Sequence, residues 1–298
     1  MSLPLPGNER LARVTGRARS VQLATGSTRY WEYGVADARV TVIMVHGFRG
    51  DHHGLEPIVA HLGGVRIVSP DLPGFGESEP LSGRPHDIDG YAAWLAEFSA
   101  AVRGAGRFVI LGHSFGSIVV SAALAHGLGA DDVVLVNPIA APALSGPRGI
   151  LTRLAVFYYW AGARLPERAG FGLLRNRAVV RIMSIAMAKT RDPDLRRFIH
   201  DQHDRYFSAF ADRRVVLEAF RASVGSDVSE FAARIPQPTL LVASDRDDIT
   251  PLPAQERLAT LFPNAALRVI PDVGHLIHYE APAAAAQFVQ EFLEAENA

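Results

Sequence analysis

The sequence contains no cysteine among its 298 residues. This absence excludes disulfide bonds, a thiolate nucleophile and metal sites with cysteine ligands. It does not distinguish a cytosolic protein from a secreted protein that lacks disulfides. Any nucleophile in this chain must therefore come from another residue type.

The chain also lacks an excess of charge of either sign, with 30 Lys and Arg residues against 31 Asp and Glu residues. A nearly neutral chain has no electrostatic footprint for nucleic acid, so we expect no nucleic-acid partner. No long basic run indicates an anionic membrane surface.

Long apolar segments are missing as well. The first residues, MSLPLPGNERLARV, contain no apolar stretch of the roughly 7–15 residues that a signal peptide needs. Later apolar stretches are interrupted by Arg, Gly or Pro, as Arg153 interrupts residues 149–165. None reaches the roughly 18 apolar residues typical of a membrane span. We therefore expect a cytoplasmic protein without a membrane span.

Short runs rich in Val, Ile and Leu alternate with helical patterns along most of the chain. Such runs are typical of strands buried on both faces of a parallel sheet. The predicted strands are residues 40–45, 65–69, 107–111, 132–136, 239–244 and 266–270, after a leading antiparallel hairpin at 20–25 and 29–34. The predicted helices are residues 89–103, 114–126, 253–261 and 281–294. The alternation predicts an α/β fold with a mostly parallel central sheet and helices on both faces.

The segment 139–234 differs from the rest of the chain. It has no clear strand pattern and is rich in Arg, Ala, Leu and aromatic residues with helical spacing. Because the strand pattern resumes at Thr239, we predict one domain with an insertion. Residues 1–138 and 235–298 form the core, and residues 139–234 form a helical cap inserted after the sixth strand.

The residues Gly112-His113-Ser114-Phe115-Gly116 join a predicted buried strand to a predicted helix. This is the G-x-S-x-G nucleophile elbow in its expected structural context. The turn is tight, and a Cβ atom on either glycine would collide with the neighbouring strand or helix. Ser114 is therefore the candidate nucleophile, placed at the positive end of the helix dipole.

A serine hydroxyl needs a base to accept its proton, and the base needs a carboxylate to orient it. His275 follows the last predicted strand and is the preferred base, with His278 as the nearby alternative. The candidate acids follow the strand 239–244 and are Asp245, Asp247 and Asp248. Of these, Asp245 is placed to cap the loop through an Asx turn, and Asp248 is placed to face solvent.

The fourth requirement is an oxyanion hole made of backbone N–H groups. One donor should be Phe115, directly after the nucleophile. The other should be Phe48, in the loop His46-Gly47-Phe48-Arg49-Gly50 that follows the strand 40–45. Glycines on both sides allow this loop to approach the nucleophile closely.

Together these motifs resemble the α/β-hydrolase family, in its capped subgroup. The matching segments are VIMVHGFRG, SPDLPGFGES, LGHSFGS, LLVASDRDDITP and DVGHLIHYEAP, in that order between Val40 and Pro282. The resemblance implies that Asp247, four residues before Pro251, is the catalytic acid, and the order Ser-Asp-His agrees with it. It also implies a structural role for Asp71. The sequence departs from the pattern at Ser117, where a second glycine is common. Asn137, after the strand 132–136, argues against a relocated acid.

Other side chains are candidates for binding a substrate or a metal ion. Tyr158, Tyr159 and Trp160 form an aromatic cluster that we predict to line an apolar substrate pocket. Two groups of histidines suggest metal ligands, namely His46 with His52 and His53, and His200 with His203. Neither group offers a convincing set of three ligands, so we predict no metal and no cofactor. Arginines in the cap leave open an anionic group on the substrate.

The sequence thus predicts a serine hydrolase that cleaves a carboxylic ester of a small to medium, apolar substrate through an acyl-enzyme. Amide, lactone or carbon–carbon bond cleavage remain alternatives. The same fold and residues would also support perhydrolysis or hydroxynitrile cleavage. A non-catalytic receptor for a small molecule is the alternative outside the enzymes, because a fold does not determine a function.

Overall fold

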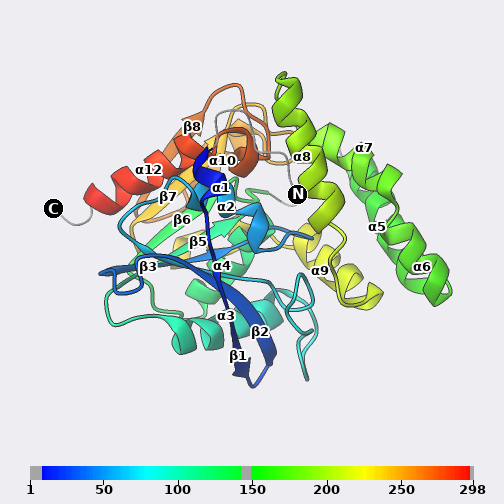
Figure 1. Cartoon of the computed structure of the whole chain (residues 1–298), viewed down its shortest axis with the longest axis horizontal. Helices are drawn as coiled ribbons and strands as arrows, with labels where there is room; N and C mark the ends of the chain where they lie inside the picture. The colour runs from blue at the N-terminus through cyan, green and yellow to red at the C-terminus, as the bar shows by residue number, and fades with distance from the viewer. Residues whose placement is uncertain (1–8, 142–148, 296–298) are drawn as a thin grey trace.

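The computed structural model describes residues 9–141 and 149–295, and it contains one eight-stranded sheet in the order β1-β2-β4-β3-β5-β6-β7-β8. The first two strands, β1 (Arg17–Leu23) and β2 (Gly26–Gly34), form an antiparallel hairpin, and β2 also pairs antiparallel with β4. All other neighbouring strands are parallel. They are β3 (Val40–Val45), β4 (Arg66–Pro70), β5 (Arg107–His113), β6 (Asp132–Val136), β7 (Thr239–Ser244) and β8 (Ala265–Ile270). The mostly parallel sheet is confirmed (Figure 1).

Helices cover both faces of this sheet, as predicted. Alternate residues of β5 show why, because Phe108 and Ile110 belong to one buried apolar cluster while Val109 and Leu111 belong to the other. The first cluster includes side chains of α3 (Ile88–Val102), α4 (Phe115–Ala125) and α10 (Leu252–Ala259). The second includes side chains of α2 (Glu56–Val59), α11 (Ile277–Glu280) and α12 (Pro282–Ala295). The remaining elements before β4 are α1 (Glu9–Ala12) and the 3-10 helix η1 (His52–Gly54).

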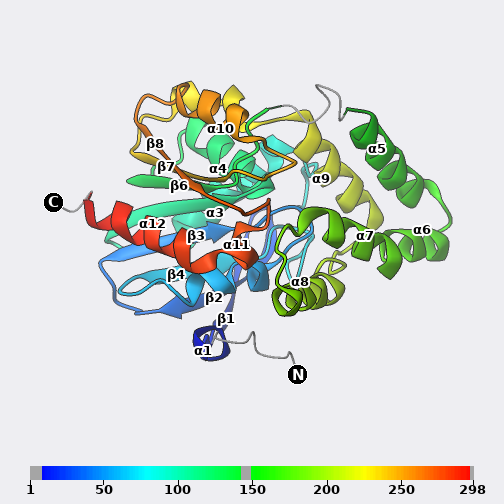
Figure 2. The same cartoon turned by 90° about the horizontal axis from the view of Figure 1, so that it is seen from above.

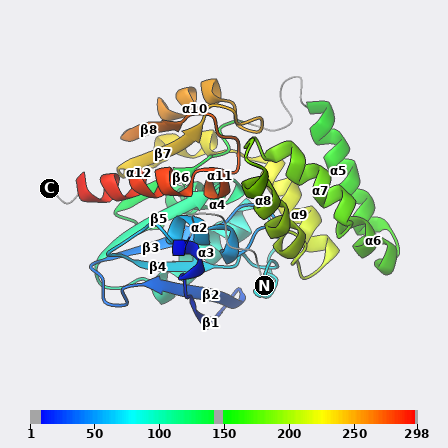
Figure 3. The ribbon, with the colours of Figure 1, turned by 45° about the horizontal axis from the view of Figure 1, so that its top comes forward.

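Helices occupy the described chain between β6 and β7. They are α5 (Gly149–Arg164), α6 (Glu167–Leu174), α7 (Arg177–Met187), α8 (Pro193–Tyr206) and α9 (Arg213–Gly225). We call α5–α9 the inserted helices, and Figures 2 and 3 show them gathered beyond one end of the sheet. Two short 3-10 helices, η2 (Val228–Glu230) and η3 (Ala232–Arg234), then pack against α4. The last part of the segment predicted as a cap therefore lies against a helix of the core.

Among the described residues, no helix has the length and apolar character that crossing a membrane requires.

Candidate active site

Ser114 lies at the sharp turn between β5 and α4. Its backbone has φ 52° and ψ −119°, a sparsely populated conformation for a residue with a side chain. The turn closes tightly, because a Cβ atom on Gly116 would lie 2.3 Å from the carbonyl oxygen of Val45. A Cβ atom on Gly112 would lie 2.6 Å from the carbonyl oxygen of Gly116. Only glycine fits at both positions, and the surrounding backbone holds the serine in its strained conformation.

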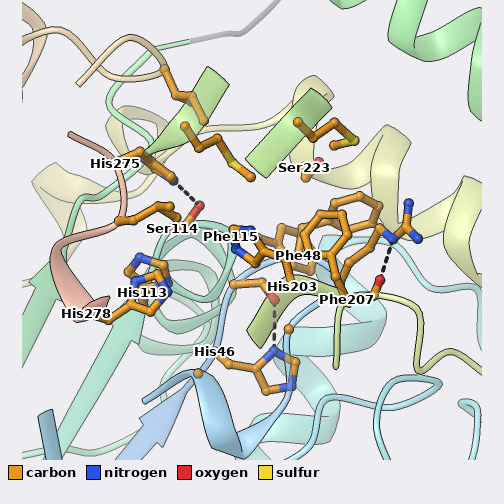
Figure 4. A pocket seen from close by; sticks show the side chains of 18 of the residues that line it. His46, Phe48, His113, Ser114, Phe115, His203, Phe207, Ser223, His275 and His278 are labelled. Carbon is orange, nitrogen blue, oxygen red and sulfur yellow. Dashed lines mark hydrogen bonds between the residues drawn. The ribbon is translucent and has the colours of Figure 1, made fainter. Parts of the chain in front are cut away.

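The structure brings Ser114, His275 and Asp247 together in one hydrogen-bonded chain. His275 Nε2 lies 2.8 Å from Ser114 Oγ, and His275 Nδ1 lies 2.7 Å from Asp247 Oδ2. Figure 4 shows the imidazole pointing at the serine hydroxyl. The alternative base, His278, lies in α11 and packs against the ring of His113, with centroids 4.2 Å apart. Geometry therefore favours His275 over His278 as the partner of Ser114.

Asp247 is buried and accepts hydrogen bonds from several groups in addition to His275. Its Oδ1 accepts from the N–H groups of Ile249 and Thr250, at 2.7 and 3.0 Å, and its Oδ2 accepts from the Thr250 hydroxyl at 2.6 Å. Burial by itself raises the pKa of Asp247. The charge and hydrogen bond of His275, with the bonds from Thr250, outweigh burial and hold that pKa well below its ordinary value. The carboxylate is thus ionised and fixed.

The Asx turn of this loop is made by Asp247, so its predicted assignment to Asp245 is wrong. The N–H groups of Ile249 and Thr250 point to the carboxylate that faces His275, while Asp245 is exposed. Asp248 is exposed, as predicted, and bonds to Lys189. One carboxylate therefore both shapes the loop and binds the imidazole.

Asn137 also contacts the acid, a role that the sequence analysis missed. Its Nδ2 donates to Asp247 Oδ2 at 3.0 Å and to Ser244 Oγ at 2.9 Å. Its φ of 43° is in the left-handed region, where Asn is enriched among residues with side chains. Because β6 lies between β5 and β7, the residue after β6 sits between nucleophile and acid. This position in the strand order was the feature of the sequence from which a contact between Asn137 and the acid could have been predicted.

The two predicted oxyanion donors lie at the same edge of the sheet, since they follow β3 and β5, which are parallel neighbours. Phe115 is the first residue of α4, where backbone N–H groups have no partner within the helix. The loop with Phe48 is fixed by His46, whose Nε2 accepts from the N–H of Leu72 at 2.8 Å. Neither Phe48 N–H nor Phe115 N–H has a hydrogen-bond partner among the residues that the structure describes. Both donors are available to a ligand.

Arg49, next to Phe48, is almost completely buried and was not singled out from the sequence. Its guanidinium donates to the carbonyl oxygens of Phe207 and Leu174, at 2.9 and 2.8 Å. It also lies over the ring of Phe207, 4.5 Å from the centroid. Leu174 is the last residue of α6, and Phe207 directly follows α8. Arg49 therefore ties the loop of Phe48 to the insertion.

A cavity of about 250 Å³ opens above Ser114 and His275. Its wall is mainly apolar, and the inserted helices provide one side of it. Apolar lining residues include Phe115, Ile139, Met183, Met187, Phe220 and Val224. Figure 4 shows Ser114 and His275 on one side of this space and Phe48 and Phe207 farther along it. The polar groups Gln202, His203 and Ser223 also face it.

The predicted pocket residues Tyr158, Tyr159 and Trp160 do not line this cavity. Tyr159 is buried behind Phe48, with ring centroids 5.6 Å apart, and Tyr158 donates its hydroxyl to the carbonyl of Leu173. Trp160 is exposed on the outer side of α5. The prediction was wrong because consecutive helical residues point in different directions, and α5 packs on α6 and α9 rather than over the nucleophile.

Hydrogen bonds within the chain account for both histidine groups considered as metal ligands. Asp51, His52 and His53 have ligand atoms within 4.8 Å of one another. However, His52 Nδ1 lies 2.9 Å from Asp71 Oδ1, and His53 Nδ1 lies 3.2 Å from Asp51 Oδ1. The second pair, His200 and His203, shares one serine hydroxyl, because each Nδ1 lies within 2.7 Å of Ser184 Oγ.

Acidification should destabilise the protein through its buried neutral histidines. Burial and the neighbouring His200 lower the pKa of His203 to about 4. Since the unfolded histidine has a pKa of about 6.5, only the unfolded state gains a proton between pH 7 and 4, and stability falls with falling pH. We expect His203 alone to lower the free energy of unfolding by about 2 kcal/mol at pH 5 relative to pH 7.5.

Urea unfolding at the two pH values would measure this loss, and His203→Gln should show a smaller loss than the wild type. His126→Gln, at a more exposed site whose imidazole contacts Phe231, is the matched control. An equal loss of stability in His203→Gln and in the wild type would contradict the assignment.

Comparisons with known proteins identify the family and the fold. The model of the alpha/beta hydrolase family matches residues 42–288. The "uncharacterized hydrolase YugF" of Bacillus subtilis is 24% identical over 275 residues, which cover 90% of this chain and 95% of that protein. The solved structure of a thermophilic esterase from Thermogutta terrifontis has a TM-score of 0.73 at 22% identity, covering 94% of this chain and 98% of the esterase. The esterase EaEST from Exiguobacterium antarcticum has a TM-score of 0.75 at 14% identity, covering 93% and 100%.

Proposed function

The chain belongs to the alpha/beta hydrolase family, and we propose that it is a serine hydrolase that cleaves carboxylic esters of small to medium, apolar substrates. The observation that carries the proposal is the continuous hydrogen-bonded chain from Ser114 through His275 to Asp247. A hydroxyl bonded to an imidazole that is in turn bonded to a carboxylate is the arrangement that activates serine for acyl transfer.

In the proposed reaction, Ser114 Oγ attacks the ester carbonyl carbon while His275 Nε2 accepts its proton. The N–H groups of Phe48 and Phe115 stabilise the oxyanion of the tetrahedral intermediate. His275 then returns the proton to the leaving alcohol as the C–O bond breaks. Water, deprotonated by His275, attacks the acyl-enzyme and releases the acid. Asp247 holds the imidazole in the required tautomer and stabilises its positive charge.

The helices between β6 and β7 act as a cap in this proposal. Met183 and Met187 of α7, and Phe220 and Val224 of α9, supply apolar wall around the nucleophile. Methionine side chains adapt to ligands of different shape because they are flexible and polarizable. The cap thus sets which acyl and alcohol groups fit beside Ser114. Ester hydrolysis is also consistent with the esterases that share the fold.

Hydrolysis of a series of p-nitrophenyl esters, from acetyl to long acyl chains, tests the proposal. We expect kcat/KM to be highest for short to medium chains, because the cavity measures only about 250 Å³. A fluorophosphonate should label the enzyme once, and mass spectrometry should locate the label on Ser114. An enzyme that is inactive on every ester and is not labelled would contradict the proposal, and lyase chemistry or ligand binding would replace it.

A further inference from the structure

Large apolar side chains are exposed mainly on the outermost inserted helices. Nine such side chains are exposed among the described residues, and six of them lie between residues 149 and 188. They are Leu154, Phe157, Trp160, Leu165, Ile182 and Ile185. The exposed fraction of Phe157 is 61% and that of Ile182 is 67%. The rings of Phe157 and Trp160 stack on each other, and both side chains are exposed to solvent. Such a concentration of exposed apolar groups marks an interaction site.

The same segment is strongly basic although the whole chain is not. Residues 149–188 contain six arginines and one acid, Glu167, which gives a net charge of +5. The chain as a whole carries −1, so the remaining residues carry −6. Arg153, Arg164, Arg168 and Arg177 are exposed, and none of these four forms an ion pair with another described residue. Because the arginines are spread over helices, the sequence shows no basic run.

The position of these helices makes both features accessible to a large flat partner. Figures 1 and 2 place α5, α6 and α7 at the end of the molecule opposite α12. We call the exposed side of α5–α7 the outer face. Met183 and Met187 of α7 line the cavity, whereas Ile182 and Ile185 of the same helix are exposed. One helix therefore separates the outer face from the cavity above Ser114.

We propose that the outer face binds the surface of a membrane that contains anionic lipids. Apolar side chains enter the boundary between headgroups and acyl chains, and arginines bind the lipid phosphates. The charge argues against a second copy of the chain on this face, since a symmetric contact would bring the same exposed arginines together on both sides. The two features needed for an anionic lipid surface, basic charge and exposed aromatic side chains, coincide on these helices.

Co-sedimentation of the full chain with vesicles tests this proposal. We expect binding to phosphatidylcholine vesicles with one third phosphatidylglycerol, little binding to phosphatidylcholine alone, and release at high salt. The double variant Arg164→Gln with Arg168→Gln should lose at least about tenfold in affinity for the anionic vesicles. The double variant Phe157→Ser with Ile182→Ser should show a similar loss. All four side chains are exposed, so thermal unfolding should match that of the wild type.

The matched controls change exposed residues elsewhere on the surface. They are Arg84→Gln with Arg103→Gln and Val35→Ser with Leu261→Ser, and they should bind like the wild type. Equal binding to both kinds of vesicle, or an equal loss in the controls, would overturn the proposal. So would an absence of vesicle binding together with a dimer in sedimentation velocity that the outer-face variants dissociate. The readout is membrane binding, so it does not depend on the proposed esterase activity.

Discussion

Replacing Ser114 by Ala should lower kcat/KM for the best p-nitrophenyl ester by about a thousandfold or more. The substitution removes the atom that would form the acyl-enzyme. The two N–H groups and the cavity remain, and by themselves they accelerate the reaction by roughly 10³–10⁴-fold over water, far less than the complete site. The fold should survive, because the one hydrogen bond of Ser114 Oγ within residues 9–141 and 149–295 is to His275, and the backbone N–H of residue 114 still donates to Val136. Steady-state kinetics and thermal unfolding of the same preparation measure both expectations.

Ser223→Ala is the matched control for this experiment. Ser223 also lines the cavity, but its hydroxyl donates to the carbonyl of Phe220 and has no contact with His275. It should retain activity within a few-fold of the wild type. If Ser114→Ala kept full activity, or if both variants lost activity equally, serine catalysis at this site would be refuted.

Replacing Asp247 by Asn should reduce kcat by about 10³–10⁴-fold. The amide would present either an N–H group to His275 Nδ1 or a neutral oxygen, so the imidazolium formed during attack would lose its compensating charge. Asp247 also accepts bonds from Ile249, Thr250 and Asn137, which an amide oxygen satisfies only in part. We therefore expect a moderate loss of stability beside the large loss of kcat.

Two measurements separate these effects. Asp245→Asn, at the exposed neighbour in the same loop, should leave kcat unchanged. Fluorophosphonate labelling of Asp247→Asn should be slower by a factor similar to that for ester hydrolysis, because both reactions need an activated Ser114. Labelling at the wild-type rate together with slow hydrolysis would show that Asp247 does not activate the nucleophile.

The sheet could be predicted from the sequence because its central strands are buried on both faces. Residues 40–45, 132–136 and 239–244 are nearly continuous apolar runs, and the structure has strands with these same bounds. The hairpin strands, predicted at 20–25 and 29–34, each begin three residues earlier in the structure, because they lack a continuous apolar run. At β5 the strand continues two residues beyond its predicted end, through Gly112 to His113. The strand was predicted to end at Leu111 because Gly112, the first glycine of the nucleophile elbow, interrupts the apolar run.

The site could be predicted only where a residue lies in the short loop or turn that follows a strand. Ser114, His275 and Asp247 are such residues, and the structure places them within hydrogen-bonding distance along one chain. The prediction that Tyr158, Tyr159 and Trp160 line the pocket failed because the orientation of α5 depends on its packing against other helices. No local sequence pattern encodes that packing. Arg49 was missed for the same reason, since its acceptors lie more than a hundred residues away.

Arg49 also has a consequence for how this architecture can diversify. Its positive charge is buried, and its hydrogen bonds go to carbonyl oxygens at the ends of α6 and α8. A recombination event that replaced the insertion with an unrelated one would remove these acceptors and leave a guanidinium without partners in an apolar environment. The loop of Phe48 and the insertion must therefore be inherited together, or residue 49 must change first.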